Sequence, residues 1–250
     1  MNAMKTQFVF EDNIIVGCPI MPLQPESYTN ECEQHSLGWY RSRLGNFTGS
    51  CIGKLMKQNK QGSFSDTAMS YIYQVAATRY MNDKIVSNDE LFAEYLEVTN
   101  VETKAMRWGT EQEASARKLY GKIKGYEVIE RGSVEHPTIK FFASSPDGYI
   151  PDDGNGKSGC LEIKCPNQDT YMRYRNEVIN GETLKKVKPE YYWQCQCHMM
   201  CTGAEWCDFI AYCPWQAKPI HIVRILPCQE DMQLIESKIN KAELIIEKLK

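Results

Sequence analysis

The chain has 250 residues, of which 42% are hydrophobic and 24% are charged, so it can bury a sizeable core and is neither disordered nor fibrous. Its formal net charge of −3 argues against a protein that coats nucleic acid through bulk positive charge. The longest strongly apolar stretches, such as 220–226, are far shorter than the roughly 20 residues that a transmembrane helix needs, so we expect no membrane association.

The cysteines indicate a reducing compartment. There are 11 of them, an odd number, and residues 1–21 lack the charged-then-apolar order of a secretory signal. We therefore expect reduced thiols and a cytoplasmic or other reducing intracellular location. No CxxC pair occurs, which argues against a zinc ribbon.

Charge is distributed unevenly along the chain. Segment 41–60 contains only basic charged residues, whereas segment 83–102 is strongly acidic. We expect one face of the protein to attract phosphate groups and another to repel them.

The first half of the chain is predicted to be mainly helical. Ser65 is a capping candidate ahead of apolar residues at helical spacing, which predicts a helix over 65–81. A second helix is expected from about Ser87, and a third over about 102–122.

The second half alternates short apolar runs with turn residues, which is typical of sheet strands. Strands are predicted at 127–130, 138–143, 149–150, 160–164, 206–212 and 220–226. Helices are predicted at 167–180 with Gly181 as the C′ glycine, at 189–201 before Gly203, and at 228–250. The fold class is therefore α/β (α+β), with a central mixed β-sheet flanked by helices.

The most informative segments are Ser-Ser-Pro-Asp-Gly at 144–148 and Leu-Glu-Ile-Lys-Cys-Pro at 161–166. Side chains alternate along a strand, so Glu162 and Lys164 would point to one face, with the Ile163 carbonyl between them. A hairpin between the two segments would bring Asp147 towards Glu162.

This combination predicts a metal site. Two carboxylates and a carbonyl are the oxygen ligands that Mg²⁺ prefers, and Lys164 would then adjoin the metal-bound water. Such a site suits hydrolysis of a phosphodiester. The alternative is an ordinary Pro-Asp-Gly turn beside a solvated Glu-Lys ion pair.

Several motifs in chain order resemble those of the PD-(D/E)xK nucleases, and within them the phage lambda exonuclease and viral recombinase family. They are WYRSRLG at 39–45, WGTEQE at 108–113, SPDG at 145–148, LEIKCP at 161–166 and QCQ at 194–196. The resemblance covers about 36–215 and implies a restriction-endonuclease-like core in a single nuclease domain spanning 1–250. Residues 1–25 are an N-terminal extension, in which the runs 8–10 and 14–16 would add a hairpin.

The resemblance implies a role for each matching residue. Glu113, Asp147, Glu162 and the Ile163 carbonyl would bind Mg²⁺, with Mn²⁺ as a substitute, and Lys164 would be the catalytic lysine beside Gln194. Arg43, Ser50 and Ser145 would hold a 5′-terminal phosphate. The corresponding structural alternatives are a solvated arginine, an exposed acid on a helix, a glutamine on the outer helix face, a serine at 50 that caps or decorates a helix, and a serine at 145 that stabilises the turn before Pro146. His198 is interpreted as structural, and an iron–sulfur cluster is not expected.

The implied function is that of a 5′-to-3′ exonuclease that degrades one strand of duplex DNA from its ends and leaves 3′ single-stranded tails for recombination. A single-strand annealing protein and a ring-shaped trimer are implied as partner and assembly, and the compartment would be a bacterial host cell if the chain is phage-encoded. Two alternatives remain: a structure-specific endonuclease of the same fold, and a catalytically silent DNA-binding recombination scaffold.

Overall fold

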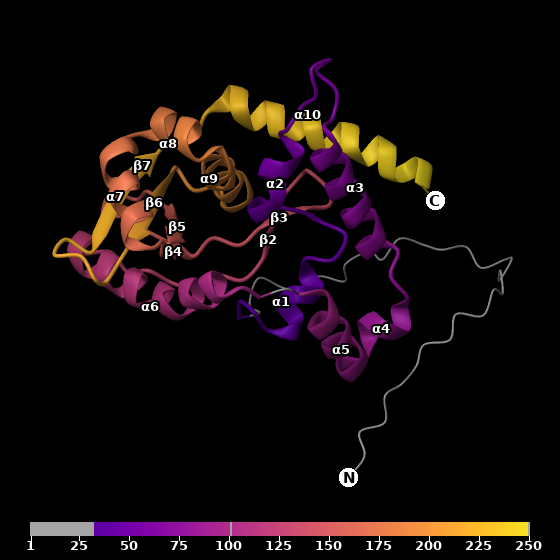
Figure 1. The fold of residues 1–250 in the computed structure, drawn as a ribbon, viewed down its shortest axis with the longest axis horizontal. Coiled ribbons are helices and arrows are strands. Elements are labelled where there is room, and N and C mark those ends of the chain that lie inside the picture. The colour runs from indigo at the N-terminus through magenta and orange to yellow at the C-terminus, as the bar shows by residue number, and fades with distance from the viewer. Residues whose placement is uncertain (1–32, 101, 250) are drawn as a thin grey trace, which may run out of the picture.

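The computed structural model describes residues 33–100 and 102–249 (Figure 1). The predicted N-terminal extension and its hairpin lie outside the described residues. The helices are α1 (Leu37–Ser42), α2 (Gly49–Leu55), α3 (Asp66–Arg79), α4 (Asp83–Ser87), α5 (Asp89–Thr99), α6 (Lys104–Lys124), α7 (Gln168–Glu177), α8 (Gly181–Val187), α9 (Pro189–Thr202), α10 (Gln229–Ile246) and the 3-10 turn η1 (Glu247–Leu249). The strands are β1 (Phe47–Thr48), β2 (Val134–Glu135), β3 (Phe142–Ser144), β4 (Gly148–Ile150), β5 (Gly159–Lys164), β6 (Trp206–Tyr212) and β7 (Ile220–Ile225).

The strands form two mixed sheets. The larger has the order β4-β5-β6-β7, in which β5 and β6 are parallel and the other pairs antiparallel. The smaller has the order β1-β3-β2, with β1 parallel to β3. The predicted fold class is confirmed, although the expected central sheet is divided where residues 145–147 separate β3 from β4.

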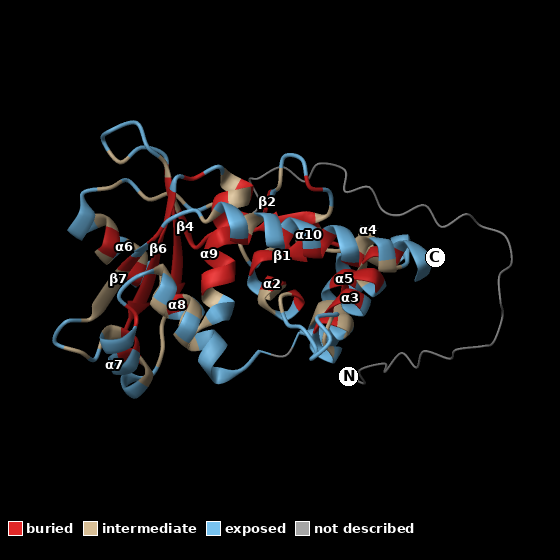
Figure 2. Cartoon of the chain, turned by 90° about the horizontal axis from the view of Figure 1, so that it is seen from above, coloured by how far each residue is buried: buried red, intermediate tan, exposed pale blue. Residues whose placement is uncertain are grey.

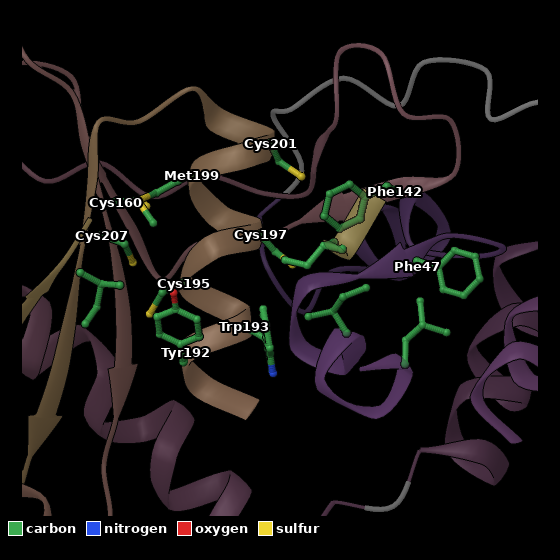
Figure 3. Close-up of a cluster of buried hydrophobic side chains, with 14 of the residues drawn as sticks. Phe47, Phe142, Cys160, Tyr192, Trp193, Cys195, Cys197, Met199, Cys201 and Cys207 are labelled. Carbon is green, nitrogen blue, oxygen red and sulfur yellow. The ribbon is translucent and has the colours of Figure 1, made fainter. Parts of the chain in front are cut away.

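Helix α9 forms the centre of the molecule. Proline starts it at the first turn, where no N–H is needed, and Gly203 ends it with a φ of 71°. Its side chains are buried nearly all round, which is typical of a helix enclosed on several sides. In Figure 3, Cys195 and Met199 face Cys160 and Cys207 of the sheet, while Cys197 faces α2.

The opposite face of the larger sheet packs on α6. Leu161 and Ile163 of β5 contact Ala116 and Tyr120 of this helix in a second apolar cluster. Each of these side chains is almost fully buried, which contributes about 1.5–3 kcal/mol for a residue the size of leucine. Figure 2 shows the burial concentrated in the strands and α9, with α7, α8 and α10 exposed on their outer sides. The predicted alternation along β5 therefore holds.

Three local predictions were wrong. Only the last two residues of the predicted strand 138–143 belong to a strand, β3, because 137–141 form a turn. Residues 127–130 form no strand, because only Ile129 makes an isolated bridge, to Tyr149. Gly181 is not the C′ residue of α7 but the first residue of α8, since Asn180 accepts a hydrogen bond from the Thr183 backbone and caps that next helix. The polar residues before Gly181 served as a start signal, not a stop signal.

The described cysteines are all free thiols, as the odd count and the context predicted. Within the described residues, no helix combines the length and apolar character required to cross a lipid bilayer.

Candidate functional site

The β4–β5 hairpin places Asp147 next to Glu162. Gly148 pairs with Leu161, and the Asp147 N–H donates to the Leu161 carbonyl at 3.0 Å. The Asp147 Oδ2 atom accepts the backbone N–H of Ile163 at 2.6 Å. Position 148 requires glycine, because a Cβ there would lie 2.7 Å from a methyl group of Val128. The turn at 145–147 thus fixes the Asp147 carboxylate against β5, the strand that carries Glu162.

Glu162 is fully buried and holds two partners. Its Oε1 forms an ion pair with Lys164, and its Oε2 lies 2.7 Å from Nε2 of His198. Burial would raise the pKa of Glu162, but Lys164 and His198 outweigh this effect and lower it. Burial would likewise lower the pKa of Lys164, but Glu162 and Asp147 raise it, so the lysine is an ammonium ion. Despite the ion pair, Oε1 has no aligned hydrogen-bond donor.

Glu113 approaches the two strand carboxylates from α6. Its Oε1 accepts a hydrogen bond from Nη2 of Arg117 at 2.6 Å, and Nε of Arg117 donates to the Asp147 carbonyl at 2.6 Å. Burial and the Asp147 carboxylate raise the pKa of Glu113 to about 8. Burial and the Glu162 carboxylate raise the pKa of Asp147 to about 6. The carboxylates therefore repel one another in a region with little water to screen them.

These observations fit a divalent cation. The donors are carboxylates and a strand carbonyl, which hard cations prefer, and a cation would relieve the repulsion that raises the two pKa values. Oε1 of Glu162 faces the Lys164 ammonium without an aligned hydrogen bond, so it is a further oxygen that a cation could use. In the described residues, no three His, Cys, Asp or Glu side chains already converge on one point. A bound cation would compete with Lys164 for Glu162 and with Arg117 for Glu113.

Arg43 forms a second, cationic group with two hydroxyls. Its Nη2 donates to Ser50 at 2.9 Å and its Nη1 to Ser145 at 3.3 Å. The guanidinium stacks on Trp39, 4.3 Å from the ring centroid, and the Trp39 indole N–H donates to Ser145 at 3.0 Å. Burial lowers the pKa of Arg43. Among the described residues no carboxylate forms an ion pair with it, so its fork of donors is available to an anion.

One cavity of about 500 Å³ connects the two groups. Its lining contains all the predicted site residues except Glu162, namely Arg43, Ser50, Glu113, Ser145, Asp147, Ile163, Lys164 and Gln194. Glu162 lies beneath this lining, in contact with Lys164. Residues from four elements, from the end of α1 and from the turn at 145–147 therefore meet in a space that accommodates a nucleotide-sized ligand.

Gln194 and Gln196 have different roles although they lie in one motif. Gln194 is 8% exposed and lines the cavity. The Gln196 amide instead donates to the Leu226 carbonyl at 3.0 Å and accepts from the Cys228 N–H at 3.0 Å. Gln196 thus joins α9 to the segment that leads into α10.

Sequence reasoning missed two residues that contact the carboxylates. His198, interpreted as structural, contacts Glu162 directly, and its position four residues after Gln194 was the signal that it shares a helical face. Arg117 gave no comparable signal. Its partner Glu113 is one helical turn away, but its contact with Asp147 is tertiary.

Comparison with known families identifies the chain. A family model described as the YqaJ-like viral recombinase domain matches residues 38–205, a segment that contains the complete cavity lining except Gln34 and His35 at its edge. The chain belongs to this family. The predicted resemblance to viral recombinases is therefore confirmed.

Solved structures agree with this family assignment. The alkaline exonuclease LHK-Exo from Laribacter hongkongensis is 30% identical to the chain, with a TM-score of 0.65, and covers 86% of this chain and 96% of its own. It was also solved in complex with dAMP. Alkaline exonucleases belong to the PD-(D/E)xK superfamily, as the resemblance implied. A phage-related exonuclease from Haemophilus somnus, 16% identical over 82% of this chain and 94% of its own, has the same fold, with a TM-score of 0.58.

A viral protein provides a partial match. An uncharacterized protein of Acanthamoeba polyphaga mimivirus is 32% identical over 118 residues, which are 44% of this chain. The matched part of the chain spans only 20% of that protein's length. The match therefore concerns one segment of a much larger viral protein.

Proposed function

We propose that this viral-recombinase family member is a Mg²⁺-dependent deoxyribonuclease that degrades one strand of duplex DNA from its ends in the 5′-to-3′ direction. The observation that carries the proposal is the single cavity in which the carboxylate–lysine cluster and the Arg43 anion site face the same space. A phosphodiester substrate needs both features, because one phosphate must react while a neighbouring phosphate is held in place.

Glu113, Asp147, Glu162 and the Ile163 carbonyl would hold the cation, with Mn²⁺ as a substitute for Mg²⁺. When bound, the cation lowers the pKa of a coordinated water from its bulk value of about 15.7 and offsets charge on the scissile phosphate. Lys164 contributes a positive charge, because its carboxylate neighbours keep it protonated. Lys164 therefore orients water or stabilises developing negative charge and does not act as a general base in this charge state. Gln194 lies in the lining and positions water or substrate through its amide.

The Arg43 group would set the direction of degradation. A terminal 5′ phosphate fits a planar fork of donors flanked by the hydroxyls of Ser50 and Ser145. Because Trp39 fixes both the guanidinium and Ser145, the phosphate site is rigid before substrate arrives. Holding the terminus at a fixed place would present the same backbone bond to the carboxylates in each cycle.

The relatives support DNA as the substrate. LHK-Exo is called an alkaline exonuclease, and its complex with dAMP shows that it binds a deoxynucleotide. The family description, viral recombinase, supports a product that enters recombination: 3′ single-stranded tails passed to an annealing protein. A ring-shaped trimer around DNA belongs to the same proposal.

The experiment compares three substrates in Mg²⁺ and in EDTA: a linear duplex with 5′ phosphates, the same duplex with 5′ hydroxyls, and a covalently closed circle. We expect nucleotides to be released faster from the phosphorylated linear duplex than from the 5′-hydroxyl duplex and not from the circle, with no reaction in EDTA and recovery with Mn²⁺. Digestion of the closed circle at the same rate would indicate an endonuclease. Binding without cleavage under all conditions would indicate a silent scaffold.

A further inference from the structure

A buried histidine connects the candidate metal ligand Glu162 to a serine on the other sheet. His198 Nε2 lies 2.7 Å from Oε2 of Glu162, and His198 Nδ1 lies 2.7 Å from the Ser144 hydroxyl. All three side chains are 0% exposed. The contact therefore extends from β3 through α9 to β5. None of the three side chains lines the cavity, and Glu162 is linked to it through Lys164.

The hydrogen bonds determine which nitrogen of His198 carries a proton. Oε2 of Glu162 lies 2.7 Å from Nε2 of His198, and a carboxylate oxygen accepts, so Nε2 is the donor in this contact. In a neutral imidazole the other nitrogen accepts, and the Ser144 hydroxyl is the donor that satisfies it. Ser144 thus selects the tautomer that presents a donor to Glu162.

The surrounding backbone is arranged to allow this contact. Gly49, the first residue of α2, lies against Ser144, and a Cβ at position 49 would lie 2.2 Å from the serine hydroxyl oxygen. The same Cβ would lie 3.3 Å from Cβ of Cys197, the residue before His198. A glycine is therefore needed here so that Ser144 and α9 can meet.

The contact has a consequence for Glu162. One carboxylate oxygen is held by His198, which leaves Oε1 as the oxygen that faces Lys164 and lacks an aligned hydrogen bond. A carboxylate fixed in this way loses little rotational freedom when it ligates a cation. A freely rotating carboxylate would lose rotational entropy each time it binds a cation.

We propose that Ser144 and His198 form a buried positioning relay that orients Glu162 for divalent-cation binding. This inference rests on the proposed function, since it assigns Glu162 to the metal. His198 is a positioning residue and touches neither substrate nor cation. Breaking the relay should weaken cation affinity and leave the Arg43 anion site unchanged.

The test measures Mn²⁺ affinity of the full-length protein without DNA, by titration calorimetry and by electron paramagnetic resonance of free Mn²⁺. We expect His198→Leu, which keeps volume but removes both hydrogen bonds, to weaken binding by about 10- to 100-fold, the range seen when partners of metal ligands are lost. His198→Gln, whose amide can still donate to Glu162, should retain most of the affinity. Ser144→Ala should give a smaller loss together with a mixture of histidine tautomers in ¹⁵N NMR spectra.

His221 provides a matched control. Its Nε2 lies 2.7 Å from the Val178 carbonyl, in a part-buried contact that involves none of the carboxylates. His221→Leu therefore removes a histidine hydrogen bond of the same length and should leave Mn²⁺ affinity unchanged. If His198→Leu fails to fold, the comparison of Ser144→Ala and His198→Gln with the wild type decides the question.

The outcomes separate the relay from the proposed function. A wild-type protein that binds no Mn²⁺ would overturn the metal site and the relay with it. Wild-type binding with equal affinity in His198→Leu and Ser144→Ala would overturn the relay alone. A loss of affinity in Ser144→Ala without any change in the histidine tautomer would also contradict the mechanism, because the serine would then act by another route.

Discussion

The backbone N–H of Ile163 donates to Oδ2 of Asp147 across 2.6 Å, so the turn before β4 is tied to the C-terminal end of β5 by a side chain and not only by the strand ladder. Asp147 also lines the cavity, and Oδ2 is the oxygen used in this bond. The bond also satisfies a buried N–H that would otherwise cost about 1–3 kcal/mol. The Asp147 carboxylate therefore combines a structural hydrogen bond with its proposed role as a cation ligand.

Asp147→Asn separates these two roles. The asparagine carbonyl oxygen can still accept the Ile163 N–H, and the repulsion with Glu162 disappears, so thermal unfolding at pH 8 should occur at an unchanged or higher temperature. Cleavage should fall by more than about 100-fold, beyond the loss typical of outer-shell partners, because a charged cation ligand is removed. Calorimetry and a nuclease assay on the same sample check both parts. Lost folding with retained specific activity would contradict the assignment.

The raised pKa values predict how a cation affects stability at different pH. Glu113 and Asp147 have folded pKa values of about 8 and about 6, above the usual carboxyl range near 4. Their contribution to stability is complete below about pH 4 and is lost as the pH rises through 6 to 8. Cation binding should reverse this loss. Mg²⁺ should therefore raise the melting temperature more at pH 9 than at pH 6, and cleavage should increase with pH over this interval.

Glu113→Gln is the control for this pH effect. The variant removes the group with the higher pKa, so the difference between the Mg²⁺-induced shifts at pH 9 and pH 6 should shrink. Equal shifts at both pH values in the wild type would contradict the raised carboxyl pKa values.

The strand part of the site could be predicted because its geometry is local. Alternation along β5 places Glu162 and Lys164 on one face, and a short hairpin suffices to bring Asp147 beside them. The helix ends at Ser65 and Gly203 are equally local, since a hydroxyl cap and a left-handed glycine act within one turn.

The remaining features depend on contacts distant in sequence. His198 meets Glu162 36 residues away and Ser144 54 residues away. Its position four residues after Gln194 indicates a shared helical face but does not identify these two partners. Gly181 was misassigned for a different reason: Asn180 before a glycine can end one helix or cap the next. Only the short separation of α7 and α8 decides between these interpretations.

Arg43→Ala should remove the preference for a 5′ phosphate. Arg43 supplies two donors at the anion site, whereas the neighbouring Arg41 is committed to the Val86 carbonyl at 2.8 Å and to Asp89. We expect the rate ratio of 5′-phosphate to 5′-hydroxyl duplex to fall at least about tenfold in Arg43→Ala, the loss of a charged hydrogen bond worth about 1.5–3 kcal/mol. Arg41→Ala, the matched control, should keep the wild-type ratio. A parallel loss in both variants would indicate a general charge effect.

Lys164→Ala should abolish cleavage while DNA binding remains. The ammonium is the cation next to Glu162, and its removal leaves that buried carboxylate without an ion-pair partner. Stability should therefore fall as well, by less than the roughly 3–5 kcal/mol typical of fully buried pairs, because the lysine side chain is 27% exposed. Adding Glu162→Gln should recover the stability but not the activity. Unchanged cleavage in Lys164→Ala would exclude the catalytic role.

Gly49→Ala tests the packing that supports the relay. The new Cβ would lie 2.2 Å from the Ser144 hydroxyl oxygen, so the serine must rotate away from His198 or α2 must shift, at a cost of about 1–3 kcal/mol. In a Ser144→Ala background the hydroxyl is absent, and the closest remaining contact, to the Cβ of residue 144, is 3.2 Å. The cost should then be smaller, which gives a non-additive double-mutant cycle. Gly109→Ala on α6, where nothing lies within 4 Å, should instead stabilise the protein by about 0.5–1 kcal/mol. Equal costs of Gly49→Ala in both backgrounds, measured by urea unfolding, would show that the serine hydroxyl is not what excludes a side chain at position 49.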